Sequence, residues 1–172
     1  MTQVATLFGG SSSAIIDPSG DFRFQLTRIW DPALPHACWI GLNPSDADAR
    51  RNDPTIRKMI GFARLWGCGG IHVVNLFAIR SPYPMYIDPF SEPTAENDRY
   101  ILDSVQGCEI VVACWGAEKV AIERAAQVLA NLKREGVKEI KCLGTTKGGQ
   151  PRHPLYLSYD LRLVDFAWQG AV

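Results

Sequence analysis

Residues 38–46 read Cys38-Trp39-Ile40-Gly41-Leu42-Asn43-Pro44-Ser45-Asp46, an apolar run that ends in polar side chains. Three further apolar runs end in a similar way: 71–74 before Asn75, 110–114 before Trp115-Gly116, and 140–144 before Thr145-Thr146-Lys147. Helical patterns lie between the runs, and parallel strands need helix-length connections, so the four runs predict a parallel β-sheet. The carboxyl ends of parallel strands share one edge, where α/β proteins bind ligands. The sequence therefore predicts one site built from four loops.

The segments between these runs have the features of helices. Asp53 followed by Pro54 is typical of a helix start, with Asp as the N-cap and Pro in the first turn. Apolar residues recur at helical spacing after this start and again across 117–135, and a further helix is expected at 94–105. The apolar positions are Ile56, Met59, Ile60, Ala63 and Leu65 in the first helix, and Val120, Ile122, Ala125, Val128, Leu129 and Leu132 in the last.

The remaining segments complete the expected fold. Residues 22–30 alternate apolar and polar side chains, which predicts a half-buried antiparallel or edge strand. The alternating tail at 161–168 is expected to close the sheet edge, and the proline-rich segment 81–93 to form an irregular loop. We therefore predict an α/β fold with a single domain over residues 1–172, in which helices flank a mainly parallel sheet in three layers and an N-terminal antiparallel or edge strand is added. The core covers about 22–157, and residues 1–13 are expected to be flexible or turn-like.

Composition narrows the function classes. The chain has 172 residues, of which 47% are hydrophobic and 21% charged, as is usual for a globular domain. Its 18 basic residues balance 18 acidic ones, which argues against a duplex-DNA binder but leaves a nucleotide or a short single strand open. Five cysteines without a CxxC pair favour buried thiols and a reducing cytoplasm. No signal peptide or membrane span is evident, so a cytoplasmic location is expected.

Metal and cofactor sites are not predicted. The cysteine spacing does not suit zinc or an iron–sulfur cluster, and the histidines at positions 36, 72 and 153 are expected to form no close pair. We therefore expect no cofactor, although a loosely bound magnesium on Asp46 or Asp48 stays open.

Three residues are candidates for catalysis. Asp46 and Asp48 follow a buried strand, where carboxylates can position water or a metal, although turn formation explains them equally well. His153 lies in a Gly- and Pro-rich loop rather than on an apolar helix face, which favours a role in a site. For Asp53, a helix N-cap is favoured over catalysis.

Eight further residues are candidates for ligand binding. The amides at 43 and 75 could contact a base edge or only the neighbouring backbone, and the arginines at 57 and 80 could hold a phosphate or pair with the aspartates. For the tryptophan at 115, packing in the core is favoured over stacking on a ligand. The lysine at 147 precedes two glycines but lacks the spacing of a phosphate-binding loop. The full set is Asn43, Ser45, Arg57, Asn75, Arg80, Trp115, Lys147 and Arg152.

Several of these segments resemble the uncharacterised family catalogued as domain of unknown function 1643. The motifs that carry the resemblance lie in the same order over residues 22–157, and Asp46 stands where the family pattern suggests threonine. They are Gly41-Leu42-Asn43-Pro44-Ser45 with Ala47-Asp48, Asn52-Asp53-Pro54-Thr55-Ile56-Arg57, Phe62-Ala63, Val74-Asn75-Leu76-Phe77-Ala78 with Arg80, Ala113-Cys114-Trp115-Gly116, and Gly144-Thr145-Thr146-Lys147 with Gly149 and Pro151-Arg152-His153-Pro154-Leu155-Tyr156. This family implies no established activity.

A weaker likeness at the level of the fold is to uracil-DNA glycosylases. Gly41-Leu42-Asn43-Pro44 and Arg152-His153-Pro154 are similar to the loops of those enzymes in their placement, which implies a glycosylase-like arrangement of the sheet. The near-neutral charge counts against it, as does the lack of a separate DNA-intercalating loop.

Three hypotheses about function follow. The chain could be an enzyme acting on a nucleobase, nucleoside or nucleotide, for example a hydrolase of N-glycosidic bonds. In that case a carboxylate would orient water, and His153 beside Arg152 would stabilise charge on the leaving group. It could instead be a binding module for nucleotides or short single-stranded nucleic acid, without chemistry. The third hypothesis is a protein-interaction domain, and the clustering of polar residues at strand ends favours the first two.

Overall fold

The computed structural model describes residues 2–5, 10–45, 47–83, 87–88, 90 and 93–167. In these residues an eight-stranded sheet has the order β1-β2-β3-β5-β4-β6-β7-β8. Its strands are β1 (Thr2–Ala5), β2 (Ser11–Ile16), β3 (Arg23–Ile29), β4 (His36–Gly41), β5 (Gly70–Asn75), β6 (Ile110–Ala113), β7 (Lys141–Cys142) and β8 (Val164–Asp165). The four predicted runs are β4, β5, β6 and β7, and they pair in parallel as expected.

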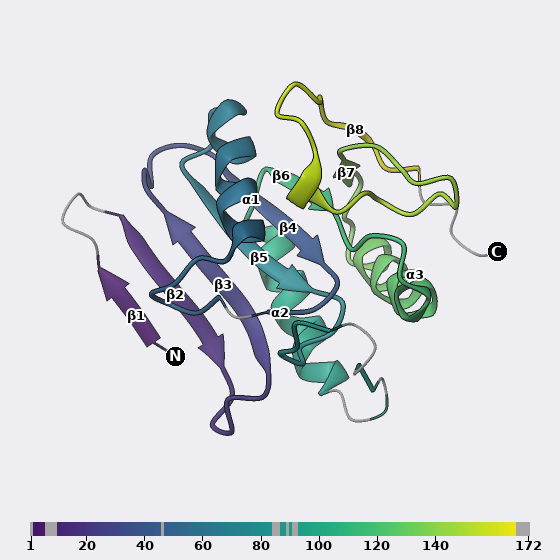
Figure 1. Cartoon of the computed structure of the whole chain (residues 1–172), viewed down its shortest axis with the longest axis horizontal. Coiled ribbons are helices and arrows are strands. Elements are labelled where there is room, and N and C mark those ends of the chain that lie inside the picture. Colours follow the sequence, from purple (N-terminus) through teal and green to yellow (C-terminus); the bar gives the residue numbers. More distant parts are fainter. Residues whose placement is uncertain are drawn as a thin grey trace.

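Three helices connect the parallel strands. They are α1 (Pro54–Leu65), α2 (Thr94–Gln106) and α3 (Lys119–Arg134). Figure 1 shows α1 across the front of the sheet, while α2 passes behind it. Two apolar clusters match these faces: one joins the sheet to α1, and the other joins it to α2 and α3. The three-layer α/β prediction is therefore confirmed.

The helix faces agree with the sequence pattern except at their margins. Ile56, Met59 and Ala63 are buried on α1 as predicted, but Leu65 in its last turn is 64% exposed. On α3, Ile122 is 53% exposed, because the buried side of the helix runs through Ala121 and Ala125 and includes a charged residue, Arg124.

The N-terminal part adds more strands than expected. β1, β2 and β3 are all antiparallel to their neighbours, and β3 pairs with β5. Residues 1–13 were expected to be flexible or turn-like, whereas 2–5 and 11–13 belong to strands. The three serines of β2, Ser11 to Ser13, pair with Ile29, Arg28 and Thr27, so sheet pairing outweighs their low strand propensity.

A bulge in β3 changes which side chains face the core. Ile15 pairs with Gln25 and Ile16 with Arg23, so Phe24 is the extra residue. Phe24 stacks on Tyr100 of α2, whereas Leu26 packs on the α1 side. The alternating pattern of residues 22–30 predicts that Phe24 and Leu26 lie on the same face of the sheet, but the bulge places them on opposite faces.

Two other segments follow the sequence pattern. The tail contributes β8, which pairs antiparallel with β7 and closes that edge of the sheet. In segment 81–93, the described residues belong to no helix or strand, and the rest lies outside the described residues. No helix in the described ranges combines the length and apolar character needed to cross a membrane.

Candidate functional site

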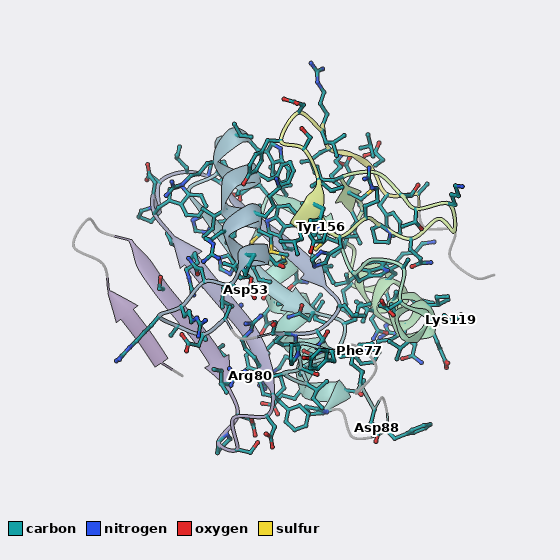
Figure 2. All side chains as sticks on the ribbon, in the orientation of Figure 1. Asp53, Phe77, Arg80, Asp88, Lys119 and Tyr156 are labelled. Carbon is teal, nitrogen blue, oxygen red and sulfur yellow. The ribbon has the colours of Figure 1, made fainter. Side chains whose placement is uncertain are left out.

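A cleft of about 390 Å³ opens at the carboxyl ends of β4, β5 and β6. Gly41, Asn75 and Trp115 line it from these strand ends, and Asp53 and Glu118 line it from the starts of α1 and α3. Figure 2 shows Asp53 at the end of α1 that lies nearest the central strand ends. The chain leaves β4 for the α1 face and β6 for the opposite face, and ligands of open α/β sheets bind where such connections diverge.

Asn75 provides the most informative side chain of the cleft. It ends β5, is 5% exposed, and its amide Nδ2 is buried without a hydrogen-bond partner among the described residues. An unpaired buried donor costs about 1–3 kcal/mol, so one that lines a cleft suits a ligand that supplies the acceptor. Gly41 makes room for this side chain, since a Cβ there would lie 2.6 Å from Asn75 Oδ1.

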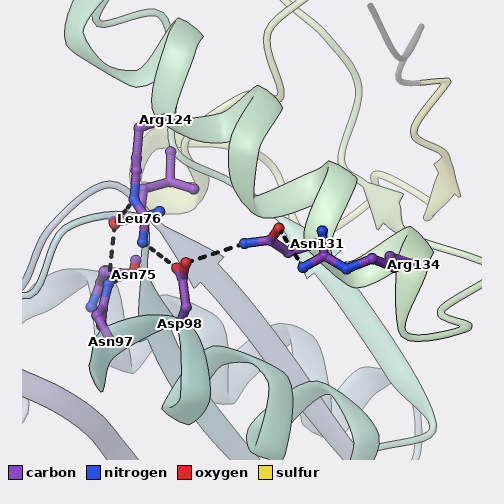
Figure 3. A network of polar contacts seen from close by, with 7 residues as sticks. All are labelled: Asn75, Leu76, Asn97, Asp98, Arg124, Asn131 and Arg134. Atoms are coloured by element: carbon purple, nitrogen blue, oxygen red, sulfur yellow. Dashed lines mark hydrogen bonds and ion pairs between the residues drawn. The ribbon is translucent and has the colours of Figure 1, made fainter. Parts of the chain in front are cut away.

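A polar network holds the backbone at Asn75 from behind (Figure 3). Asn97 Nδ2 of α2 donates to the carbonyl oxygens of Asn75 at 3.0 Å and of Leu76 at 3.1 Å. Arg124 Nε of α3 donates to the Leu76 oxygen at 2.9 Å, and its guanidinium pairs with Asp98. Both Asn97 and Arg124 are buried, so two helices fix the end of β5.

Arg23 is a cleft residue that sequence analysis missed. It is 2% exposed, its Nη1 donates to the carbonyl oxygen of Ala47 at 2.6 Å, and its Nε is buried without a partner among the described residues. Burial lowers the pKa of Arg23 to about 10, and the charge of Asp53 opposes this shift. The guanidinium therefore stays charged at neutral pH. Sequence analysis missed Arg23 because a polar residue in an alternating strand is expected to face solvent. The bulge at Phe24, which turns Arg23 toward the cleft, has no signal in the sequence.

Asp53 is the N-cap of α1, as predicted. Its Oδ1 accepts a hydrogen bond from the backbone N–H of Ile56 at 2.8 Å. The same side chain lines the cleft together with Thr55. Asp53 therefore stabilises the helix and also places a negative charge in the cleft.

His153 and Glu118 also line the cleft: His153 comes from the segment before a 3₁₀ helix that packs on α1, and Glu118 from the start of α3. His153 is exposed and precedes the 3₁₀ helix η2 (Pro154–Tyr156), where its Nδ1 accepts a hydrogen bond from the backbone of Leu155 at 3.5 Å. Partial burial lowers the pKa of His153, and Asp53 opposes this shift. Glu118 is the exposed N-cap residue of α3 and makes no side-chain capping bond.

Three further predicted residues line the cleft with mainly structural contacts. Asn43 Nδ2 donates to the carbonyl oxygens of Pro44, Ile79 and Ser81, at 3.2, 3.3 and 2.8 Å, so it ties two loops together. Trp115 is 2% exposed, and its indole N–H donates to Gln150 Oε1 at 2.9 Å, as the favoured core interpretation predicts. Ser45 is half-buried at the cleft wall.

The predicted aspartates are not both described. Asp48 accepts hydrogen bonds from the backbone of Arg50 at 2.7 Å and of Arg51 at 2.8 Å, which lower its pKa, and it does not line the cleft. It acts in the structure as a turn former. Asp46 lies outside the described residues.

Four predicted cationic residues lie outside the cleft lining. Arg57 Nη1 donates to the carbonyl oxygen of Asn52, and Arg80 Nη1 to that of Gly20, so both hold backbone segments. Lys147 lies exposed in the turn between Thr145 and Pro151, and Arg152 is exposed beside His153. None of the four therefore lines the cleft, although Arg80 lies close enough to Arg23 to lower its pKa.

The expectation that the histidines form no close pair is wrong. His72 Nε2 lies 3.3 Å from His36 Nδ1, because β4 and β5 are neighbours in the sheet. The pair lies near the amino-terminal ends of the strands, at the edge opposite the cleft. Cys38, Cys114 and Cys142 are buried as predicted. The described residues contain no group of three His, Cys, Asp or Glu side chains that could hold a metal ion.

Comparison with known proteins identifies the family but no activity. Residues 23–155 match the family model described as "Protein of unknown function (DUF1643)", and the chain therefore belongs to this family. No curated protein matches the chain. No solved structure matches it either, so the likeness to uracil-DNA glycosylases stays a prediction.

Proposed function

We propose that this chain binds a nucleobase in the cleft at the carboxyl ends of β4, β5 and β6. The base could be free, part of a nucleoside or nucleotide, or part of a short single strand. The observation that carries the proposal is the buried Asn75 amide, whose Nδ2 has no partner among the described residues and which lines the cleft.

The chemistry of an asparagine amide suits a base edge. The side chain offers two N–H donors and a carbonyl acceptor side by side, so it can pair with a base that presents an acceptor next to a donor. The network through Asn97 and Arg124 holds the Asn75 backbone and so restricts where the amide can lie. A side chain that is already held in place loses little conformational freedom when it binds, which favours recognition of a specific ligand.

The size and charge of the cleft are also compatible with a base. A volume of about 390 Å³ falls in the range of small-molecule sites, which is roughly 300–1,000 Å³. The buried Nε of Arg23 is a second donor without a partner among the described residues, and it suits a carbonyl oxygen of the ligand.

A second candidate function is hydrolysis of an N-glycosidic bond. It is favoured by His153, which lines the cleft together with two carboxylates, Asp53 and Glu118. A carboxylate could orient water while His153 stabilises the leaving group, and one such acid–base group contributes about 10²–10⁴-fold in rate. His153→Ala should then lower turnover by that factor while changing the melting temperature little. A destabilised variant with full activity would remove His153 from this role.

Binding can be tested by thermal shift and calorimetry with free bases, nucleosides, nucleotides and short single-stranded oligonucleotides. Asn75→Asp replaces the donor with an oxygen at constant shape and should abolish binding of any hit. Lys147→Ala is the control, because Lys147 lies outside the cleft lining. Binding that survives in folded Asn75→Asp, or no hit in the whole panel, would contradict the proposal and leave the protein-interaction hypothesis.

A further inference from the structure

The charged residues of the cleft do not make a phosphate site. Among its lining residues, Arg23 is positive, while Asp53 and Glu118 are negative. Burial lowers the pKa of His153, so the ring is neutral near pH 7. One positive charge against two negative charges gives the lining a net negative charge, which opposes a phosphate dianion.

The other positive side chains lie outside the cleft lining, although Arg28 and Arg80 are close enough to Arg23 to lower its pKa. All 18 lysines and arginines fall within the described residues, and Arg23 is the one that lines the cleft. The guanidinium of Arg23 is already used in part, since it donates to Ala47 and lies in the field of Asp53. Its Nε, which is buried without a partner among the described residues, can donate to a single acceptor such as a carbonyl oxygen.

Both helices that start at the cleft have an acidic residue at the N-cap position, but only the one before α1 caps its helix with the side chain. Backbone N–H groups at a helix N-terminus attract anions, and both α1 and α3 begin at the cleft. Asp53 already accepts the N–H of Ile56 in α1. Glu118 is the N-cap residue of α3, is exposed, and makes no side-chain capping bond there, so its charge faces solvent at the cleft.

Building on the proposed function, we propose that the cleft selects uncharged bases and nucleosides over their phosphorylated forms, with Glu118 as the residue that sets this selection. Glu118 fits this role because it is not needed to cap α3. Asp53, by contrast, stabilises α1, so a change there would alter the fold as well as the charge.

The test compares matched ligands by calorimetry: four nucleosides and their 5′-monophosphates, first with EDTA and then with Mg²⁺. Glu118→Gln removes one charge from the cleft. Glu135→Gln is the matched control, because it removes the same charge at the opposite end of α3, outside the cleft lining. We expect a nucleoside to bind more tightly than its monophosphate. Glu118→Gln should raise the affinity for the monophosphate about fivefold relative to the affinity for its nucleoside.

The outcomes separate the two proposals. If neither form of any ligand binds, the proposed function is overturned, and this inference falls with it. If a monophosphate binds at least as tightly as its nucleoside, with or without Mg²⁺, the selection is overturned while the proposed function stands. If the preference exists but is equal in Glu118→Gln and the wild-type protein, Glu118 does not set it. A gain in monophosphate affinity in both variants alike would reflect net charge and would also remove Glu118 from this role.

Discussion

At the scale of single residues, the cleft depends on a close approach between two strands. Gly41 ends β4 and Asn75 ends β5, and the two are paired in register. The glycine is required for space rather than for an unusual backbone angle, since its φ is not positive. A side chain at this position would displace the amide that the ligand is proposed to contact.

Gly41→Ala tests this directly. Its Cβ would lie 2.6 Å from Asn75 Oδ1, so the amide must rotate or the strands must shift. Overpacking of this kind costs about 1–3 kcal/mol. We expect a lower free energy of unfolding in urea and loss of base binding. Gly148→Ala is the control, because its Cβ would meet nothing closer than 3.9 Å. Unchanged binding in Gly41→Ala would show that the position of Asn75 does not matter.

Asp53 has two roles that substitution can separate. Asp53→Ala removes the N-cap of α1 and should lower the free energy of unfolding by about 1 kcal/mol. Asp53→Asn keeps a capping oxygen but removes the charge. Because Asp53 raises the pKa of His153, that pKa should fall further in Asp53→Asn. An NMR titration of the histidine resonances measures this shift, and an unchanged or higher pKa would contradict the assigned interaction.

At the scale of elements, α2 and α3 act together on the end of β5. Arg124 is buried on α3 and bonds both Leu76 and Asp98, so two helices and one strand share a single guanidinium. The helical pattern predicted α3 well but could not reveal this, because a charged residue at a helical position indicates a solvated face. The partner carbonyl comes from a distant strand, which periodicity cannot identify.

Arg124→Met should therefore destabilise the protein although it adds apolar surface. The change leaves the Leu76 carbonyl without its donor and Asp98 without its ion pair, at a cost of about 1–3 kcal/mol. Base binding should weaken as well, because the Asn75 backbone is adjacent. Urea denaturation and calorimetry measure the two effects. Ile122→Gln on the exposed face of α3 is the control and should change neither. If Arg124→Met changed neither the free energy of unfolding nor base binding, the network would be dispensable.

At the scale of the whole molecule, the fold was more predictable than the site. Four apolar runs with helical connections suffice to predict a parallel sheet and the edge where its loops meet. The cleft itself depends on tertiary placement: Asn75 and His153 were identified because they follow strands or lie in a loop, whereas Arg23 depends on a bulge. Arg57 and Arg80 have the right chemistry, but their side chains bond the backbone of Asn52 and Gly20 instead.

The close contact between His36 and His72, which the sequence did not predict, should make the stability of the protein depend on pH. Burial, together with His36, lowers the pKa of His72. The unfolded chain then binds a proton before the folded protein does, so stability falls as the pH drops below the ordinary histidine value. His153 has a lowered pKa and contributes with the same sign.

We therefore expect a lower free energy of unfolding at about pH 5.5 than at about pH 7.5, and a smaller difference in His72→Gln. Glu109 and Asp48 have lowered pKa values, so their contributions are lost only under more acidic conditions. Urea denaturation at the two pH values measures the difference, and His153→Gln separates the contribution of the cleft histidine. An equal pH dependence in His72→Gln and the wild-type protein would show that the buried pair does not limit stability in acid.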